Sequence, residues 1–351
     1  LVWDGQGDLY LGTAGHGIYR QAAGGALEPI AAGQQDLASK PVSHLALVGG
    51  RLFAATPAAL FYTDDGGQSW AQTQPVPGGI SALAAADART LFVGTPANGL
   101  FLSVDEGQTW QPASAGLGGA AGVYLSVTAL RVDPQEGGVL YAAVSSLVGG
   151  TQLHSAAVGT FVTLDSGQSW QPLAGPSFPQ AKPALALLLA PGQPLYAWSV
   201  AVDGLQTYTP DVAGALSTLQ QTTAGVQPRA TAARTLGLAR AQAASGSLLA
   251  AVADPSPAVS QAAGEALGRI ADSRTTSDLL LALQSPVPHV RRSAATALGM
   301  MRAAAAVEPL SAILLRGDPA MAGIAAAALG RIGTQDATQA LLAALADAQM
   351  T

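Results

Sequence analysis

The chain has 351 residues, carries a formal net charge of −6 and contains no cysteine. Without cysteine, the sequence excludes disulfides, thiolate catalysis and thiolate zinc sites. Charged residues make up 11% of the chain, and no stretch holds the ~18–20 uninterrupted apolar residues that a membrane-spanning helix needs.

Short apolar and aromatic runs separated by glycine-rich turns recur along residues 1–212. Examples are LYLG (9–12), LFAA (52–55) and LFVG (91–94), and each is followed by a second run after a turn of small residues. Five such units follow one another, with about four short strands in each. Even spacing of short strands with periodic glycines and aromatics predicts a propeller of which five blades are visible, with the total number of blades left open. Because the chain starts at Leu1 in strand-like sequence, we expect an upstream segment: further blades, a signal peptide or a lipid anchor.

Three hexapeptides of one pattern lie in this first region: DGGQSW (65–70), DEGQTW (105–110) and DSGQSW (165–170). A catalytic acid needs one special environment, whereas three equivalent copies indicate repeated structural work. An aspartate can accept backbone N–H bonds in a turn, a glycine supplies a positive φ, and a tryptophan can bury ~150–250 Å² between blades. The sequence therefore predicts three structural turns, formed by Asp65, Gly67, Trp70, Asp105, Gly107, Trp110, Asp165, Gly167 and Trp170.

A different repeat occupies residues 213–351, where glycines 237, 268, 299 and 330 follow a leucine at a constant step of 31 residues. Pro257, Pro288 and Pro319 keep the same step, and proline is favoured at the first position of a helix. Ser256 and Asp318 precede two of them as expected N-caps. The pattern predicts two helices per repeat, stacked as an α–α solenoid of about four and a half repeats. The net charge changes from −8 to +2 between the regions, so we place the domain boundary at 212/213.

Both repeats resemble known families. The hexapeptides, each preceded by Thr or Ser two residues before the Asp, resemble the Asp-box or BNR repeat of sialidases, sortilin-type receptors and photosystem II assembly-factor propellers. The 31-residue unit resembles the HEAT-like repeats of the phycobilisome-lyase type over about residues 215–347. These resemblances imply an Asp-box β-propeller followed by a HEAT-like solenoid, with the Asp-box turn between the third and fourth strands of a blade.

Catalytic patterns of the resembled enzymes are missing from the sequence. A sialidase uses three converging arginines, a tyrosine–glutamate pair and an acid/base aspartate, and this region has only Arg20, Arg51, Arg89 and Arg131. The four histidines are isolated, without the pairing of a metal site. We therefore predict no catalytic, metal-binding or cofactor-binding residues and no enzymatic activity.

Candidate partner-binding residues come from three segments that are predicted as long loops around the fourth blade: 114–125, 145–159 and 174–183. Long loops on a rigid scaffold often carry contacts, although they can also be unselective insertions. We select Tyr124, Leu147, His154 and Phe178.

Arginines of the helical half give a second candidate surface. Arg291 and Arg292 are expected near the start of a second helix, where they could line a partner-binding groove, whereas most other arginines fall near helix ends and complement the helix dipole. A net charge of +2 over this half is too weak for nucleic acid.

These observations favour a non-catalytic protein–protein interaction subunit or assembly factor of a larger complex. The alternative is a glycan-binding or sialidase-like carbohydrate-active propeller. Low lysine, absent cysteine and the habitat of the resembled families suggest an extracytoplasmic location, with membrane association through partners or an upstream anchor. The resemblance makes a photosynthetic complex one possible setting.

Overall fold

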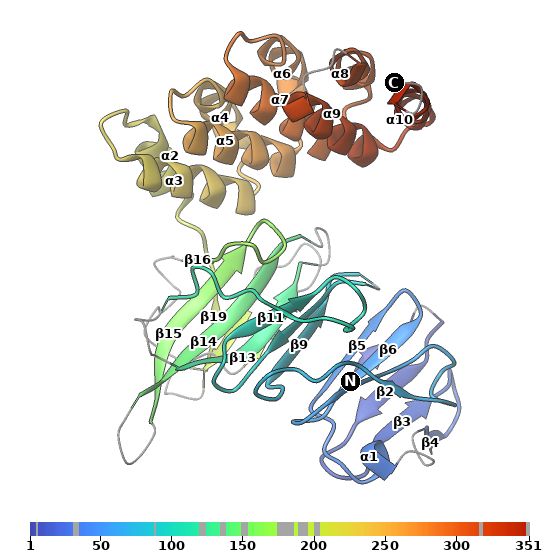
Figure 1. The fold of residues 1–351 in the computed structure, drawn as a ribbon. Coiled ribbons are helices and arrows are strands. Elements are labelled where there is room, and N and C mark those ends of the chain that lie inside the picture. The colour runs from blue at the N-terminus through green and yellow to red at the C-terminus, as the bar shows by residue number, and fades with distance from the viewer. Residues whose placement is uncertain are drawn as a thin grey trace. The chain divides into compact units, whose positions relative to one another are not determined.

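The computed structural model describes residues 1–4, 6–30, 35–87, 89–118, 124–133, 138–148, 154–173, 186–188, 196–199, 204–315 and 319–348. The chain divides into two compact units, Leu1–Thr209 and Pro210–Thr351. The division lies three residues before the boundary expected from the sequence. The first unit consists of β-sheets with one short helix, and the second of helices (Figure 1).

The first unit contains a series of small antiparallel sheets in which neighbouring strands follow one another along the chain. Four of the sheets have four strands, and the fifth has three among the described residues. The first sheet consists of β1 (Val2–Trp3), β2 (Leu9–Gly12), β3 (Ile18–Gln21) and β4 (Leu27–Pro29). A short helix, α1 (Gln35–Ala38), leads to the second sheet of β5 (His44–Val48), β6 (Arg51–Ala55), β7 (Leu60–Thr63) and β8 (Ala71–Gln72). The third sheet consists of β9 (Ala82–Ala85), β10 (Leu91–Gly94), β11 (Leu100–Ser103) and β12 (Gln111–Pro112).

The fourth sheet differs from the others in the length of its strands. It consists of β13 (Tyr124–Val132), β14 (Leu140–Val148), β15 (His154–Thr163) and β16 (Gln171–Pro172), and the fifth of β17 (Ala186–Leu188), β18 (Tyr196–Ser199) and β19 (Gly204–Thr207). The prediction of a long loop over 145–159 was wrong, because β14 and β15 continue as a paired ladder from Leu140↔Thr163 to Val148↔His154. The register shifts once along this ladder, since Val144 pairs with Gly159 and Ser145 with Ala157, which leaves one extra residue on β15.

Adjacent sheets pack against one another through apolar side chains. Phe92 of the third sheet and Leu130, Leu140 and Phe161 of the fourth belong to one buried cluster. Similar clusters join the first sheet to the second and the second to the third. First strands of successive sheets also contact one another, from β1 to β5, β9, β13 and β17. Within the described residues, no comparable contact between β1 and β17 closes a ring.

The second unit is a stack of paired helices (Figure 1). Its longer helices contact one another in the order α3, α5, α7 and α9, and α2, α4, α6 and α8 each pack on the following longer helix. The helices are α2 (Val212–Gln220), α3 (Val226–Leu238), α4 (Ser245–Val252), α5 (Pro257–Ile270), α6 (Thr276–Ala282), α7 (Pro288–Met300), α8 (Val307–Leu315), α9 (Pro319–Ile332) and α10 (Gln335–Ala348). Three 3-10 turns precede α4, α6 and α8: η1 (Gln242–Ala244), η2 (Ser273–Thr275) and η3 (Ala304–Ala306).

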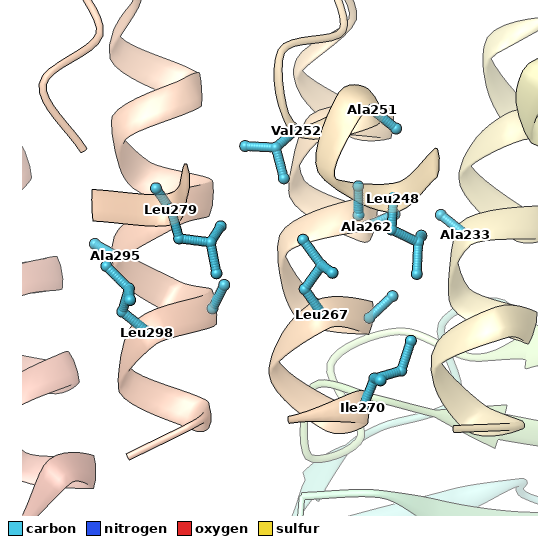
Figure 2. Packing of buried hydrophobic residues seen from close by; sticks show 14 of the residues in the cluster. Ala233, Leu248, Ala251, Val252, Ala262, Leu267, Ile270, Leu279, Ala295 and Leu298 are labelled. Atoms are coloured by element: carbon cyan, nitrogen blue, oxygen red, sulfur yellow. The ribbon is translucent and has the colours of Figure 1, made fainter. Parts of the chain in front are cut away.

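The 31-residue step places the same residue type at the same point of the core in every repeat. Leu236, Leu267, Leu298 and Leu329 are fully buried in one continuous cluster. Figure 2 shows Leu267 of α5 and Leu298 of α7 together with Leu248 of α4 and Leu279 of α6. These leucine side chains lie in the space between paired helices. The glycines after the first three of these leucines let helices approach closely: a Cβ at Gly299, for example, would lie 2.7 Å from the Cα of Ala328. Of the described helices, none is long and apolar enough to span a membrane.

Helix starts follow the prolines, although one predicted cap is not formed. Pro257 and Pro288 occupy the first turn of α5 and α7. The Ser256 side chain makes no capping hydrogen bond, and the Ser256 backbone N–H donates to the carboxylate of Asp254 at 2.8 Å. Asp318, the other predicted cap, lies outside the described residues.

Candidate functional site

The three hexapeptides form tight turns between the third and fourth strands of the second, third and fourth sheets. In the third sheet, the Ser103 hydroxyl donates to Asp105 Oδ1 at 2.7 Å, and the Thr109 N–H donates to the same oxygen at 2.9 Å. The Thr109 hydroxyl donates to Asp105 Oδ2 at 2.6 Å. The Gly107 N–H in turn donates to Ser103 Oγ at 2.8 Å. Both oxygens of the carboxylate are therefore bound within their own turn.

The other two hexapeptides repeat this arrangement. Asp65 accepts hydrogen bonds from Thr63 and Ser69, and Asp165 accepts the equivalent bonds from Thr163 and Ser169. Hydrogen bonds to the charged form of a carboxylate lower its pKa. The Thr109 side chain, then its N–H and the Ser103 hydroxyl, lower the pKa of Asp105 to about 2. Bonds from Ser69 and Thr63 lower the pKa of Asp65 in the same way.

Two features favour glycine in each hexapeptide: its positive backbone angle φ and the lack of space for a side chain. Gly67, Gly107 and Gly167 have φ of 97°, 85° and 84°, in the left-handed region that disfavours other residues. A Cβ at Gly167 would lie 2.6 Å from Phe92 of the preceding sheet. A Cβ at Gly107 would likewise lie 2.7 Å from Thr73, which follows the second sheet.

The tryptophans tie each turn to the sheet before it. Trp170 Nε1 donates to the carbonyl of Ala113 at 2.8 Å, and Trp110 Nε1 donates to that of Gln74 at 3.0 Å. Trp70 Nε1 donates to the Ile30 carbonyl at 3.3 Å. Each acceptor follows the last strand of the preceding sheet. The hexapeptide turns thus join neighbouring sheets in addition to closing their own hairpins.

The structure brings three of the four predicted loop residues to one end of the fourth sheet. Tyr124 begins β13 and pairs with Leu147 of β14, and His154 begins β15 and pairs with Val148. The Tyr124 side chain is 57% exposed. These residues lie at strand ends instead of in loops, and Phe178 lies outside the described residues.

The two predicted arginines of the helical unit differ in their surroundings. Arg291, on α7, lines a groove of about 890 Å³ between the α6–α7 turn and helices α8 and α9. Arg292, the next residue, is exposed and does not belong to this groove. Residues from α8, among them Glu308 and Ile313, complete the groove and were not selected from the sequence. Comparison of the 31-residue repeats position by position would have been needed to find them.

Among the described residues, no group of three or more His, Cys, Asp or Glu side chains lies close enough together to hold a metal ion. Among the described arginines of the first unit, Arg20 and Arg51 form ion pairs with acidic side chains. Arg51, for example, pairs with both Asp64 and Glu106 and lies over the ring of Tyr62 at 4.6 Å. This arrangement bridges the second and third sheets.

Family models agree with these repeats. The HEAT-repeat model matches residues 216–289 and 276–350, and the BNR/Asp-box repeat model matches residues 61–72. The chain therefore carries HEAT repeats in its helical unit and an Asp-box repeat in its sheet unit.

Parts of the chain are also similar to solved structures. A GH74 xyloglucanase from Xanthomonas campestris is 19% identical with a TM-score of 0.40, and the alignment covers 57% of this chain and 36% of that one. The CpcE–CpcF complex of phycocyanin lyase from Nostoc is 22% identical with a TM-score of 0.30, covering 35% and 52%. YCF48 bound to a D1 peptide is 14% identical with a TM-score of 0.29, covering 58% and 88%. No curated protein matches the sequence.

Proposed function

We propose that the chain is a non-catalytic protein–protein interaction scaffold, acting as a subunit or assembly factor of a larger complex. The observation that carries this proposal is the state of the three hexapeptide aspartates. Each carboxylate is held by the hydroxyl and amide donors of its own turn. A general acid or base needs a pKa near the working pH, whereas the pKa of Asp105 is lowered to about 2. In this proposal, the carboxylates stabilise the hexapeptide turns, and the repeats provide surfaces that bind other proteins.

We further propose that the five sheets are blades of an Asp-box propeller. Their strand order, the contacts between successive first strands and the tryptophan bonds from each turn to the preceding sheet support this architecture. A propeller and a helical solenoid both offer broad, rigid surfaces, which suits binding of other proteins. We place the protein outside the cytoplasm, associated with a membrane through its partners.

Isolation of the chain from its native source by an affinity tag, followed by cross-linking and mass spectrometry, tests the scaffold proposal. The expected result is a stoichiometric partner protein whose cross-links map to the end of the fourth sheet or to the helical unit. The Asp105→Asn variant serves as a control that should retain the partner. Isolation of the chain without any partner protein, together with specific binding to an oligosaccharide array, would overturn the proposal in favour of the glycan-binding alternative.

A further inference from the structure

A buried ion pair links the first two repeats of the helical unit. Arg229, on α3, donates from Nε to the carbonyl of Ala224 at 3.2 Å and pairs through Nη1 with Asp254, in the α4–α5 turn of the next repeat. The two side chains are only 11% and 10% exposed. Asp254 therefore fills the space beside Arg229 and neutralises its charge.

Arg291 occupies the position of Arg229 two repeats later, 62 residues on at the 31-residue step. Its Nη1 donates to the carbonyls of Ser285 and Pro286 at 2.9 and 3.1 Å, and Pro286 is the counterpart of Ala224. The two arginines are thus anchored on equivalent turns of their repeats.

Among the described residues, the acid of the pair has no counterpart at the second position. Two steps after Asp254 the sequence has Arg316, a residue of the same charge as Arg291. Arg316 and Asp318, the acid of the same turn, lie outside the described residues. No carboxylate of the described residues forms an ion pair with Arg291, and among the described residues that line the groove the one of opposite charge is Glu308. An arginine with five donors is left with hydrogen-bonding capacity beyond its two backbone acceptors.

An open groove lies beside this arginine. It has a volume of about 890 Å³. Its lining is largely apolar and includes Leu283, Pro309, Ile313 and Met321. Leu283 and Met321 are almost fully buried, so they form the floor, and the exposed Glu308 lies at the rim.

We infer that this groove binds an acidic and apolar peptide segment of a partner protein. In this inference, which rests on the proposed scaffold function, a carboxylate of the segment pairs with Arg291 as Asp254 pairs with Arg229. A neighbouring apolar side chain of the segment fills the floor beside Leu283 and Met321. Arginine binds a carboxylate in a bidentate manner, which fixes the direction of the segment as well as its position.

The rim carboxylate narrows the choice of ligand. Glu308 repels a polyanion, so a nucleic acid or a highly acidic tail fits the groove poorly. A segment with one acid next to leucine, isoleucine or methionine satisfies both Arg291 and the apolar floor without placing a second negative charge near Glu308.

Binding of the intact chain to an array of octapeptides with uncharged, chemically blocked ends tests this inference. Each peptide has a central Asp, Asn or Lys, and its neighbours are drawn from Leu, Ile, Ser and Gly. We expect peptides with a central Asp and an apolar neighbour to bind at least about tenfold more tightly than their Asn twins, since charge-assisted hydrogen bonds are the strong ones. Arg291→Gln should abolish this preference, and Arg292→Gln, on the same helix but outside the groove, should retain it.

Two further variants distinguish a loss of specific contacts from a loss of folding. Arg291→Lys keeps the charge and should preserve the preference for Asp at weaker affinity, and Ile313→Ser should weaken the effect of the apolar neighbour alone. Equal binding of Asp and Asn peptides, or an Asp preference that survives Arg291→Gln, would overturn the inference. The cross-linking experiment separates the two proposals: a native partner cross-linked elsewhere refutes only the groove, whereas absence of any partner together with specific oligosaccharide binding refutes the scaffold.

Discussion

Two glycines at equivalent positions of neighbouring repeats should respond in opposite directions to the same substitution. Gly299, near the end of α7, approaches α9 so closely that an added Cβ would lie 2.7 Å from the Cα of Ala328. Gly330, 31 residues later in α9, has no heavy atom within 4 Å of an added Cβ. Both glycines lie within helices, so alanine brings the same gain in helix propensity at both, about 1 kcal/mol at most.

At Gly299, the neighbouring backbone of α9 adds a packing cost to the alanine substitution, and at Gly330 this cost is absent. Forcing a methyl group into a packed contact costs about 1–3 kcal/mol, because one helix must move away. We therefore expect Gly330→Ala to raise the free energy of unfolding of the helical unit by about 0.5–1 kcal/mol. Gly299→Ala should lower it by up to about 2 kcal/mol, the difference between the packing cost and the propensity gain.

Urea unfolding followed by circular dichroism at the helix band measures both values. The full chain is used, with the helical transition compared among wild type and the two variants. A shift of the same sign and size in both variants would refute the packing described for α7 and α9.

Three other variants test contacts between repeats and within the hexapeptide turns. Trp170→Phe removes the indole donor and leaves a carbonyl of the preceding sheet without it, so the sheet unit should lose about 1–3 kcal/mol in urea unfolding; an unchanged midpoint would contradict this role. Arg229→Ala leaves Asp254 buried without its partner and should cost the helical unit about 3–5 kcal/mol, whereas a double-mutant cycle without coupling would show that the pair contributes nothing. The pKa values of Asp65 and Asp105 are below their ordinary 3.8 in the folded chain, so their stabilisation is present above about pH 4 and is lost as the pH falls toward 2. The thermal midpoint of the double Asp→Asn variant should therefore depend less on pH in that window, and an equal dependence in wild type and variant would contradict the assignment.

Much of the fold follows from repetition in the sequence. The 31-residue step of leucines and glycines predicts the paired helices, because every repeat must bury the same stripe against the next. The three hexapeptides likewise predict tight turns, since an aspartate, a glycine and a tryptophan at fixed spacing suit one hairpin. Their donors and acceptors, such as the Ala113 carbonyl for Trp170, depend on how successive sheets meet and could not be read from the sequence.

Irregular features were harder to predict. The segment 145–159 is rich in serine, glycine and alanine, a composition typical of loops, and only the pairing of β14 with β15 makes most of it strand. The predicted cap at Ser256 does not form, and the turn instead has a hydrogen bond from the Ser256 N–H to Asp254. The unmatched charge of Arg291 becomes visible only after the Arg229–Asp254 pair is seen, because it emerges from comparing equivalent positions of two repeats.

The assignment of the hexapeptide aspartates as structural residues can be tested by a carboxyl carbon-13 NMR titration of Asp105 in the folded chain. Because the Thr109 side chain, its N–H and the Ser103 hydroxyl all stabilise the charged form, the titration should give a pKa of about 2. A pKa at or above the ordinary 3.8 would show that these donors do not hold the carboxylate, and would reopen an acid–base role for the Asp-box turns.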